Sequence, residues 1–262
     1  MVSAMPSFYF DESIHDRGGF IVGAFVYGQD ADSAVSAAIR RVGLQPGVDE
    51  FKSCARMSEH RPQVALRAEL RQILRDYRIG VVVVPSSDRT SLCEHAFRGL
   101  DQIARANNIV GVPGLEAVFD RGLFRSTKEG AELAARFGLD RYCCIRVEQD
   151  SRIMKGLQLA DLVAHTAAMI LLETLGIVTK LVKAGPCSGY DEDLDLNLGF
   201  EMWASLRYQF FYAGPVREQD EIYQGALMEI GENGLYIASS RSDELRSAAL
   251  GRFRENYLGC IH

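Results

Sequence analysis

The chain has 262 residues, 47% of them hydrophobic, which allows one large domain, or one domain with an appendage, around a sizeable core. Its net charge of -6 argues against a protein that coats nucleic acid through a basic surface. The N-terminus has no basic region followed by an apolar stretch, and no apolar run reaches about 18 residues. We therefore expect a cytoplasmic protein that does not span a membrane.

The cysteines contain no C-x-x-C pair, so we expect them to be reduced, buried, small apolar residues of a cytoplasmic protein. Two of them are adjacent in a strand-like run and should point to opposite faces of the strand. The six are Cys54, Cys93, Cys143, Cys144, Cys187 and Cys260.

Residues 8–10 are three consecutive aromatic residues, which favour a buried strand, and two carboxylates follow them at Asp11 and Glu12. Ligands of α/β proteins bind outside the carboxyl ends of the strands, so Asp11 is a candidate functional acid. The alternative is that these acids and Ser13 only begin a turn. Residues 20–27 predict a second strand that forms a hairpin with the first.

A helix is predicted at residues 31–42, and after it Glu50 and Lys52 flank one aromatic residue; Glu50 is the second candidate acid. The helix predicted at residues 64–78 is amphipathic, and its arginines lie on a face of their own. We interpret that face as a solvated surface, with a phosphate-binding face as the alternative. The arginines are Arg67, Arg71, Arg75 and Arg78.

The middle of the chain alternates between strands and helices, which predicts an α/β layered domain. The strand at residues 115–120 ends in Asp120, the third acid, and Arg121 follows directly. Its neighbours along the chain are a buried strand at 80–85, a helix at 91–107, a helix at 128–137 and a strand at 142–147.

Residues 151–175 predict a helix that is apolar almost all the way round, interrupted by Asp161 and His165 on one face. An acid in such a helix costs free energy unless it is paired, hydrogen-bonded or metal-bound, so it indicates either function or structural pairing. We interpret His165 as a satisfied core histidine or an orienter of the acid. Beyond residue 176, helices at 201–211 and 243–257 predict a mostly helical extension.

The four acids Asp11, Glu50, Asp120 and Asp161 thus come from four different elements. Carboxylates that crowd together resist ionisation unless a cation lies among them. Sites made only of oxygen suit Mg²⁺ or Mn²⁺, and two such ions about 4 Å apart can assist phosphodiester cleavage.

These motifs resemble the bacterial family called domain of unknown function 3800, which in turn resembles the ribonuclease H-like fold. The resemblance covers about residues 7–175, and its most specific part is residues 157–161, Leu-Gln-Leu-Ala-Asp. It implies a ribonuclease H-like mixed sheet flanked by helices over residues 1–175, with a mostly helical extension over 176–262. A helix before Glu50 departs from that fold, which usually has a third meander strand there.

The resemblance also implies roles for particular residues. The four acids would be catalytic and would hold two Mg²⁺ or Mn²⁺ ions, with Asp11 bridging them. Lys52, Arg121 and Gln158 would hold or orient the scissile phosphate or the acids. Four further residues are candidates of lower rank for the site: Glu12, Ser13, Ser151 and His165. Glu12 would take the place of Asp11 if the strand register shifted by one residue.

Two functions remain open from the sequence. The first is a metal-dependent nuclease or phosphodiesterase that cleaves RNA, DNA or a hybrid by a two-metal-ion mechanism. The second is a scaffold of the same fold that binds nucleic acid or protein without cutting. The C-terminal helices could form a homodimer surface, a lid or a specificity module.

Overall fold

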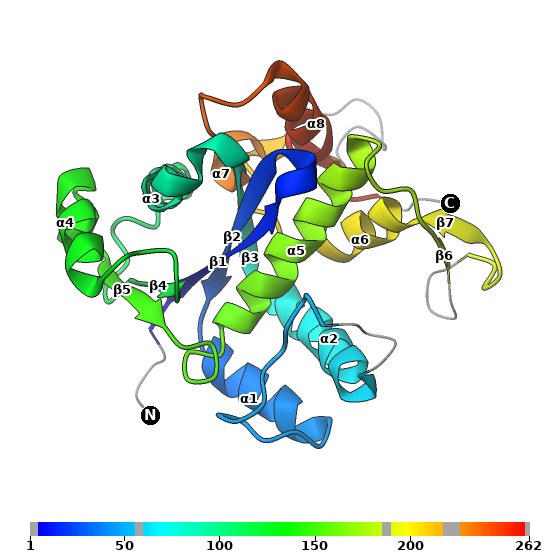
Figure 1. Cartoon of the computed structure of the whole chain (residues 1–262), viewed down its shortest axis with the longest axis horizontal. Helices are drawn as coiled ribbons and strands as arrows, with labels where there is room; N and C mark the ends of the chain where they lie inside the picture. The colour runs from blue at the N-terminus through cyan, green and yellow to red at the C-terminus, as the bar shows by residue number, and fades with distance from the viewer. Residues whose placement is uncertain (1–4, 56–59, 185–189, 217–225, 260–262) are drawn as a thin grey trace.

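A mixed six-stranded sheet lies at the centre of the computed structural model, which describes residues 5–55, 60–184, 190–216 and 226–259 (Figure 1). Its strand order is β10-β3-β2-β1-β4-β5. An α/β class with a mixed sheet flanked by helices is therefore confirmed. The strands are β1 (Ser7–His15), β2 (Phe20–Gly28), β3 (Arg78–Pro85), β4 (Glu116–Asp120), β5 (Cys144–Gln149) and β10 (Leu235–Ile237).

The pairing of β1 with its two neighbours positions the strand ends. The predicted hairpin is present, because β2 runs antiparallel to β1 with Ala24 opposite Asp11, and β3 continues this antiparallel arrangement. On its other side β1 pairs in parallel with β4, and Phe10 lies opposite Phe119. The residues that follow this pair are Asp11 and Asp120, so the register brings two candidate acids to the same edge of the sheet.

Helices cover both faces of the sheet (Figure 1). One face packs against α1 (Ala31–Arg41), α2 (Arg61–Ile73), α5 (Leu157–Thr174), α6 (Leu198–Leu206) and α8 (Asp243–Phe253). The other packs against α3 (Leu92–Ala106) and α4 (Thr127–Phe137). The predicted helix at 64–78 ends early because β3 begins at Arg78, and α5 begins six residues later than predicted because turns occupy residues 151–156.

Side chains of β1 alternate between the two faces of the sheet. Tyr9 is buried in the cluster under α5, whereas Phe8 and Phe10 are buried in the cluster under α3. The same alternation places Asp11 on the α5 face and Glu12 on the α3 face. The aromatic run therefore does more than fill the core: it determines which face each of the following carboxylates takes.

The C-terminal part contains both helices and strands, so the prediction of a mostly helical extension omitted its strands. Strand β10 lies in the central sheet, parallel to β3, so residues 176–262 contribute to the same sheet as residues 1–175. Three-residue strands lack the length from which alternation can be read in a sequence. The remaining elements are β6 (Leu181–Lys183), β7 (Asp195–Asn197), β8 (Gly214–Pro215), β9 (Leu227–Glu229), α7 (Gly231–Gly234) and β11 (Glu255–Tyr257).

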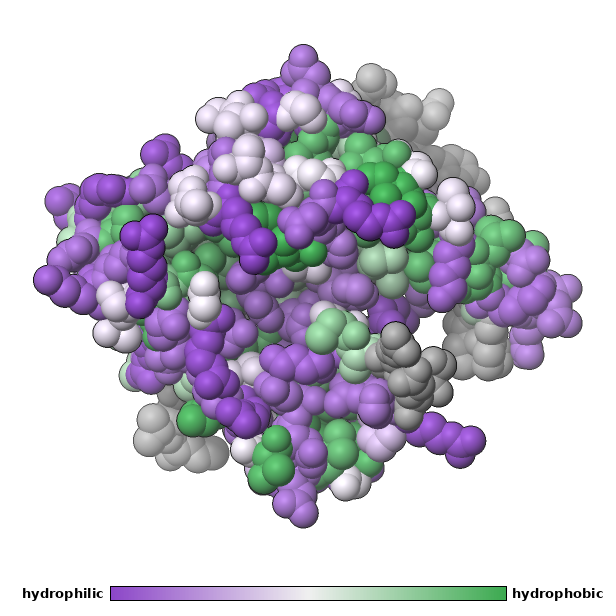
Figure 2. All heavy atoms as spheres, in the orientation of Figure 1, coloured by the Kyte–Doolittle hydropathy of each residue, from purple (hydrophilic) through white to green (hydrophobic). Residues whose placement is uncertain are grey.

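Helix α5 is long and apolar enough by composition to cross a membrane, but 72% of it is buried inside the protein, as expected of a core helix. The outer face in Figure 2 is mainly hydrophilic, with hydrophobic areas in separate patches.

All four cysteines within the described residues are free. Cys93 and Cys143 are buried as expected, but Cys54 and Cys144 are exposed, because one lies in a loop and the other on the outer face of β5. Cys187 and Cys260 lie outside the described residues.

The close contact between α3 and the sheet depends on a glycine. A Cβ atom at Gly99 would lie 2.7 Å from Cγ2 of Val82, which is shorter than normal carbon contacts. We expect Gly99→Ala to lower the free energy of unfolding by about 1–3 kcal/mol, since the helix must move off the strand. Urea denaturation measures this change.

The matched control is Gly251→Ala in α8, where the added Cβ would meet nothing within 4 Å. There the change should raise stability by up to about 1 kcal/mol, because alanine favours a helix and restricts the unfolded chain. Equal effects of the two substitutions would contradict the close packing of α3 on β3.

Candidate functional site

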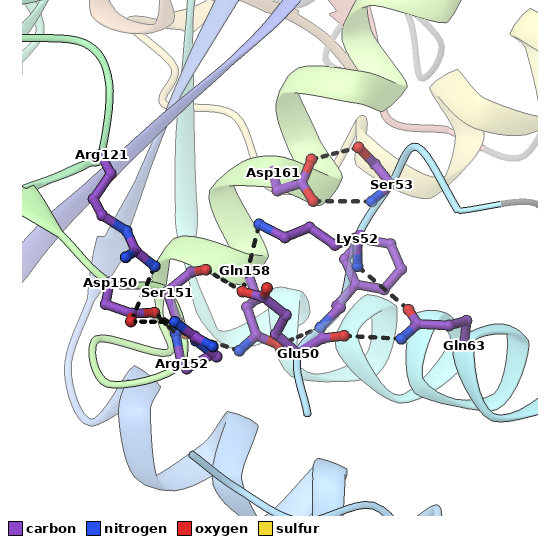
Figure 3. Close-up of polar contacts among 11 residues, drawn as sticks. Glu50, Lys52, Ser53, Gln63, Arg121, Asp150, Ser151, Arg152, Gln158 and Asp161 are labelled. Carbon is purple, nitrogen blue, oxygen red and sulfur yellow. Dashed lines mark hydrogen bonds and ion pairs between the residues drawn. The ribbon is translucent and has the colours of Figure 1, made fainter. Parts of the chain in front are cut away.

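The four candidate acids interact electrostatically beside the first turns of α5, where β1, β4 and the loop before α2 converge. Two of them, Glu50 and Asp161, are shown in Figure 3. Asp11 interacts electrostatically with Asp161 and Asp120, and both Asp120 and Asp161 interact with Glu50. Residues up to 150 positions apart in the sequence thus form a single group of carboxylates.

Asp11 is the most enclosed of these acids. Burial raises its pKa well above the ordinary value, and the nearby carboxylates of Asp161, Glu12 and Asp120 raise it further. The side-chain carboxylate of Asp11 has one hydrogen bond within the described residues, which the backbone amide of Glu12 donates at 2.8 Å. A single amide offsets little of the repulsion, so Asp11 resists ionisation unless positive charge approaches it.

Asp161 is fixed on α5 by Ser53 from the loop before α2. The backbone amide of Ser53 donates to Oδ2 at 2.9 Å, and its hydroxyl donates to Oδ1. Burial nevertheless raises the pKa of Asp161, although these bonds and the charge of Lys52 oppose the rise. The start of α5 can approach β1 because residue 156 is glycine: a Cβ there would lie 2.4 Å from the ring of Tyr9.

Glu50 is held from two directions by polar side chains (Figure 3). The hydroxyl of Ser151 donates to its Oε2 at 2.5 Å, and the side-chain amide of Gln63 donates to its backbone oxygen at 2.8 Å. Buried Gln158 ties the two loops together, since it accepts from the amide of Phe51 and donates to the carbonyl of Ser151. Gln158 therefore positions the site through backbone contacts instead of facing a substrate.

Lys52 places one ammonium group among the carboxylates. Its Nζ lies 3.4 Å from Oε2 of Glu50, and 46% of its side chain is exposed. Burial lowers the pKa of Lys52, but Glu50, Asp120 and Asp161 together raise it above the ordinary value. Lys52 thus neutralises part of the charge and can still reach a ligand in solvent.

At the end of β4, Asp120 has a free oxygen within the described residues. Its Oδ1 is buried and has no hydrogen-bond partner there. Burial raises the pKa of Asp120, while the amide of Arg121 and the charges of Lys52 and Arg121 oppose this. The guanidinium of Arg121 lies 2.9 Å from Asp150, which also binds Arg152 (Figure 3).

Glu12 takes part in a separate arrangement on the α3 face. The register of β1 keeps it opposite Gly23, so it does not replace Asp11. Burial and the charge of Asp120 raise the pKa of Glu12 to about 7, against the lowering effect of Arg89. Asp120, at the end of the neighbouring strand β4, interacts electrostatically with both acids of β1.

The polar side chains on the α5 face continue beyond the acids. Oγ of Ser13 and Nε2 of His15 are 2.9 Å apart. One turn after Asp161 lies His165, whose pKa falls to about 4 because of burial and the positive charges of Arg67 and His15. His165 is therefore neutral at pH 7 and is partly buried, and its interpretation as a satisfied core histidine or an orienter of the acid stays a prediction.

Some residues of the site were missed in the sequence. Asp150 and Gln63 had no distinguishing pattern, because their roles depend on partners far along the chain. The arginines of α2 were interpreted as a solvated face: Arg75 and Arg78 are exposed, but Arg67 and Arg71 are partly buried. Their spacing of four residues along the helix, continued back to Gln63, is the signal that could have indicated a face turned inward.

The donor atoms of the site suit a divalent cation. All four acids supply carboxylate oxygens, one of which, Oδ1 of Asp120, lacks a partner among the described residues. Within these residues no three His, Cys, Asp or Glu side chains are arranged as a complete set of metal ligands. Ser53, Ser151 and Lys52 contact carboxylates of the group, so an incoming ion would have to compete with them.

The raised pKa of Glu12 predicts a dependence of stability on pH. Because its pKa is about 7 when folded and 4.5 ordinarily, the folded state keeps this proton to higher pH than the unfolded chain does. The stabilisation is complete below about pH 4.5 and is lost as the pH rises through 7. We expect Glu12→Gln to raise the free energy of unfolding by up to about 3 kcal/mol at pH 8 and to change it little at pH 4.5.

Urea denaturation in EDTA at the two pH values measures this difference. Glu132→Gln is the control, because Glu132 is exposed on α4 and has no role in the group. A Glu12→Gln effect that is the same at both pH values would show that the carboxyl group is not held in its protonated form.

Comparison with protein-family models, with curated proteins and with solved structures found no match to this chain. The resemblance to the domain of unknown function 3800 family therefore stays a prediction, and the geometry of the site carries the functional argument.

Proposed function

We propose that the protein is a metal-dependent phosphodiesterase that cleaves nucleic acid. The observation that carries this proposal is the convergence of four carboxylates from four elements, opposed in the described residues mainly by the ammonium of Lys52 and, at Asp120, by the guanidinium of Arg121. Carboxylates so close together remain ionised only with additional positive charge. Divalent cations supply such charge, and phosphate esters are the substrates on which cations held by carboxylates commonly act.

In this proposal Asp11, Glu50, Asp120 and Asp161 hold Mg²⁺ or Mn²⁺. When bound, the ions would lower the pKa of a water molecule and stabilise negative charge on the phosphate. Each acid already has a fixed direction: β1 and β4 hold two of them by their register, Ser53 holds Asp161, and Ser151 holds Glu50. A fixed arrangement of this kind lowers the free energy needed to form a metal site.

The positive groups near the acids fit contacts with a phosphate backbone. Lys52 lies among the carboxylates with almost half of its side chain exposed. Arg121 and Arg152 lie on the far side of Glu50, at 51% and 42% exposure, and share Asp150 (Figure 3). A substrate phosphate could replace Asp150 as the partner of either arginine, because exposed ion pairs are weak.

A ribonuclease H-like architecture is part of the proposal. Strands β1 to β3 form an antiparallel arrangement, and the acids lie on the first strand, on a later strand and on a late helix, in the order that the resemblance implies. The position of Glu50 departs from the ribonuclease H-like pattern. That fold usually has the third strand before this acid, whereas here α1 and a loop precede Glu50 and β3 follows it.

A non-catalytic scaffold is the second candidate, and one observation favours it. Ser53, Ser151 and Lys52 already give hydrogen bonds or charge to Asp161 and Glu50, so part of the group is satisfied without a cation. Such a protein would bind nucleic acid or another protein through this fold. It leaves the convergence of Asp11 and Asp120 unexplained.

A thermal melt with Mn²⁺ tests the metal site without a substrate. Binding to the folded state alone raises stability by mass action, by about 2.7 kcal/mol at a hundred times the Kd. We expect this rise in the wild-type protein and in the control Asp140→Asn, an exposed acid outside the group. In Asp11→Asn the rise should be absent, although the variant should be at least as stable as wild type in EDTA because a buried acid has been removed.

No Mn²⁺ response in the wild-type protein, or an equal response in Asp11→Asn, would contradict a metal site at Asp11. Stability of the variant in EDTA shows that it is folded, so a lost response cannot be assigned to misfolding.

Cleavage of labelled RNA, DNA and hybrid oligonucleotides in Mn²⁺ separates the two candidate functions. We expect Asp11→Asn and Asp161→Asn each to cleave more than about a hundredfold more slowly than wild type, since loss of even an outer partner of a metal ligand costs 10- to 100-fold. Binding measured in EDTA should persist in both. Cleavage by both variants at the wild-type rate would refute the nuclease and leave the scaffold.

A further inference from the structure

Arg67 of α2 is a partly buried cation without a full set of partners. Its Nε and Nη2 atoms are inaccessible to solvent and have no hydrogen-bond acceptor in the described residues. Buried guanidinium donors normally have hydrogen-bond acceptors, so two buried donors without an acceptor call for an explanation. A guanidinium presents its donors in a fixed fork that matches the oxygens of phosphate or carboxylate.

The carboxylate that acts electrostatically on Arg67, that of Glu201, is already bound by another arginine. Arg71, one turn further along α2, contacts Glu201 of α6 through two bonds of 2.9 and 3.4 Å. His165 adds no charge at neutral pH, because burial and the neighbouring cations lower its pKa to about 4. The local balance is therefore two guanidinium groups against one carboxylate, with Arg67 left in excess.

Arg67 borders a cavity large enough for a ligand. This cavity has a volume of about 430 Å³ and lies between α2 and α6. Arg67, Arg71 and Glu201 supply its charged groups, and Val64, Leu198 and Met202 supply apolar walls.

Two helices, α2 and α5, connect the acid group with Arg67, which borders the cavity. Along α2, Gln63 contacts the backbone of Glu50, and Arg67 follows four residues later. Along α5, Asp161 belongs to the acid group, and His165, which faces Arg67, also follows four residues later. Four residues of helix advance about 6 Å, a step on the scale of one nucleotide in an extended strand.

We propose that Arg67, once its guanidinium turns from its buried position into the cavity, binds a phosphate group of the nucleic-acid strand one nucleotide away from the phosphate at the acids, with Arg71 as the second donor. This inference rests on the proposed function for the identity of the ligand. Phosphate fits better than a carboxylate partner, because a strand whose scissile phosphate lies at Asp161 must carry another phosphate toward Arg67. The site therefore selects polymers over mononucleotides.

Inorganic phosphate probes the site without metal or cleavage. We expect sodium phosphate in EDTA, compared with sodium chloride at equal ionic strength, to raise the Tm of the wild-type protein and of the control Arg75→Met. Arg75 is exposed beyond the end of α2. Arg67→Met should be at least as stable as wild type in chloride, since an unpaired buried charge is gone, and should show no rise in phosphate. An equal rise in Arg67→Met would overturn the proposal.

Binding of a labelled single-stranded oligonucleotide in EDTA tests the polymer contact. One lost phosphate contact should reduce the slope of log Kobs against log salt by about 0.7 and weaken binding at low salt several-fold. We expect this for Arg67→Met, a smaller loss for Arg67→Lys, and none for Arg75→Met. An unchanged salt slope in Arg67→Met would refute the contact. Failure of the nuclease proposal would appear separately, in the Mn²⁺ melt of Asp11→Asn, which does not involve Arg67.

Discussion

Repulsion among carboxylates that are removed from water is the constraint on which the rest of the structure depends. Asp11, Asp120 and Asp161 each have a raised pKa with burial as the largest cause, and each adds to the difficulty of ionising the next. The fold limits this repulsion with a few local donors and charges, among them two serine hydroxyls, the backbone amides of Glu12 and Ser53, and the cationic groups of Lys52 and Arg121. The group is thus held together by the surrounding packing while its own charges oppose it, as is typical of a site prepared for a cation.

The sheet separates neighbouring acids that would otherwise compete. Asp11 and Glu12 are adjacent in the chain, yet β1 directs one toward α5 and the other toward α3. Asp120, at the end of the neighbouring strand, interacts with both. A change in the protonation of Glu12 therefore changes the electrostatic energy of Asp120 on β4, and through Asp120 that of Asp11 and Glu50.

The presence of the strands that carry Asp11 and Asp120, and the apolar helix, could be predicted from the sequence, because period-two and all-round apolar patterns are local. The predicted end of the first strand was wrong, since β1 continues past Asp11 to His15, where it still pairs with β2. From these patterns followed the hairpin, the buried position of Asp161 and the choice of Asp11, Asp120 and Asp161 as candidate acids. Glu50 was chosen differently, from its place after a helix and beside Lys52 and one aromatic residue. The pairing of Ser53 with Asp161 and the burial of Arg67 could not be predicted, since both depend on how α2 and its preceding loop pack against α5. The place of β10 beside β3 could not be predicted either, because a strand of three residues is too short to show an alternating pattern in the sequence.

The position of β10 beside β3 has a consequence for synthesis of the chain. Strand β3 is made early and is buried and apolar over almost its whole length, whereas its partner β10 comes some 150 residues later. Until then the edge of β3 facing β10 offers unpaired backbone groups beside a run of four valines, a surface that readily joins strands of other chains. A chain stopped between α5 and β10 would already contain the acid site but would be prone to aggregate, so the last part of the sequence protects what the first part builds.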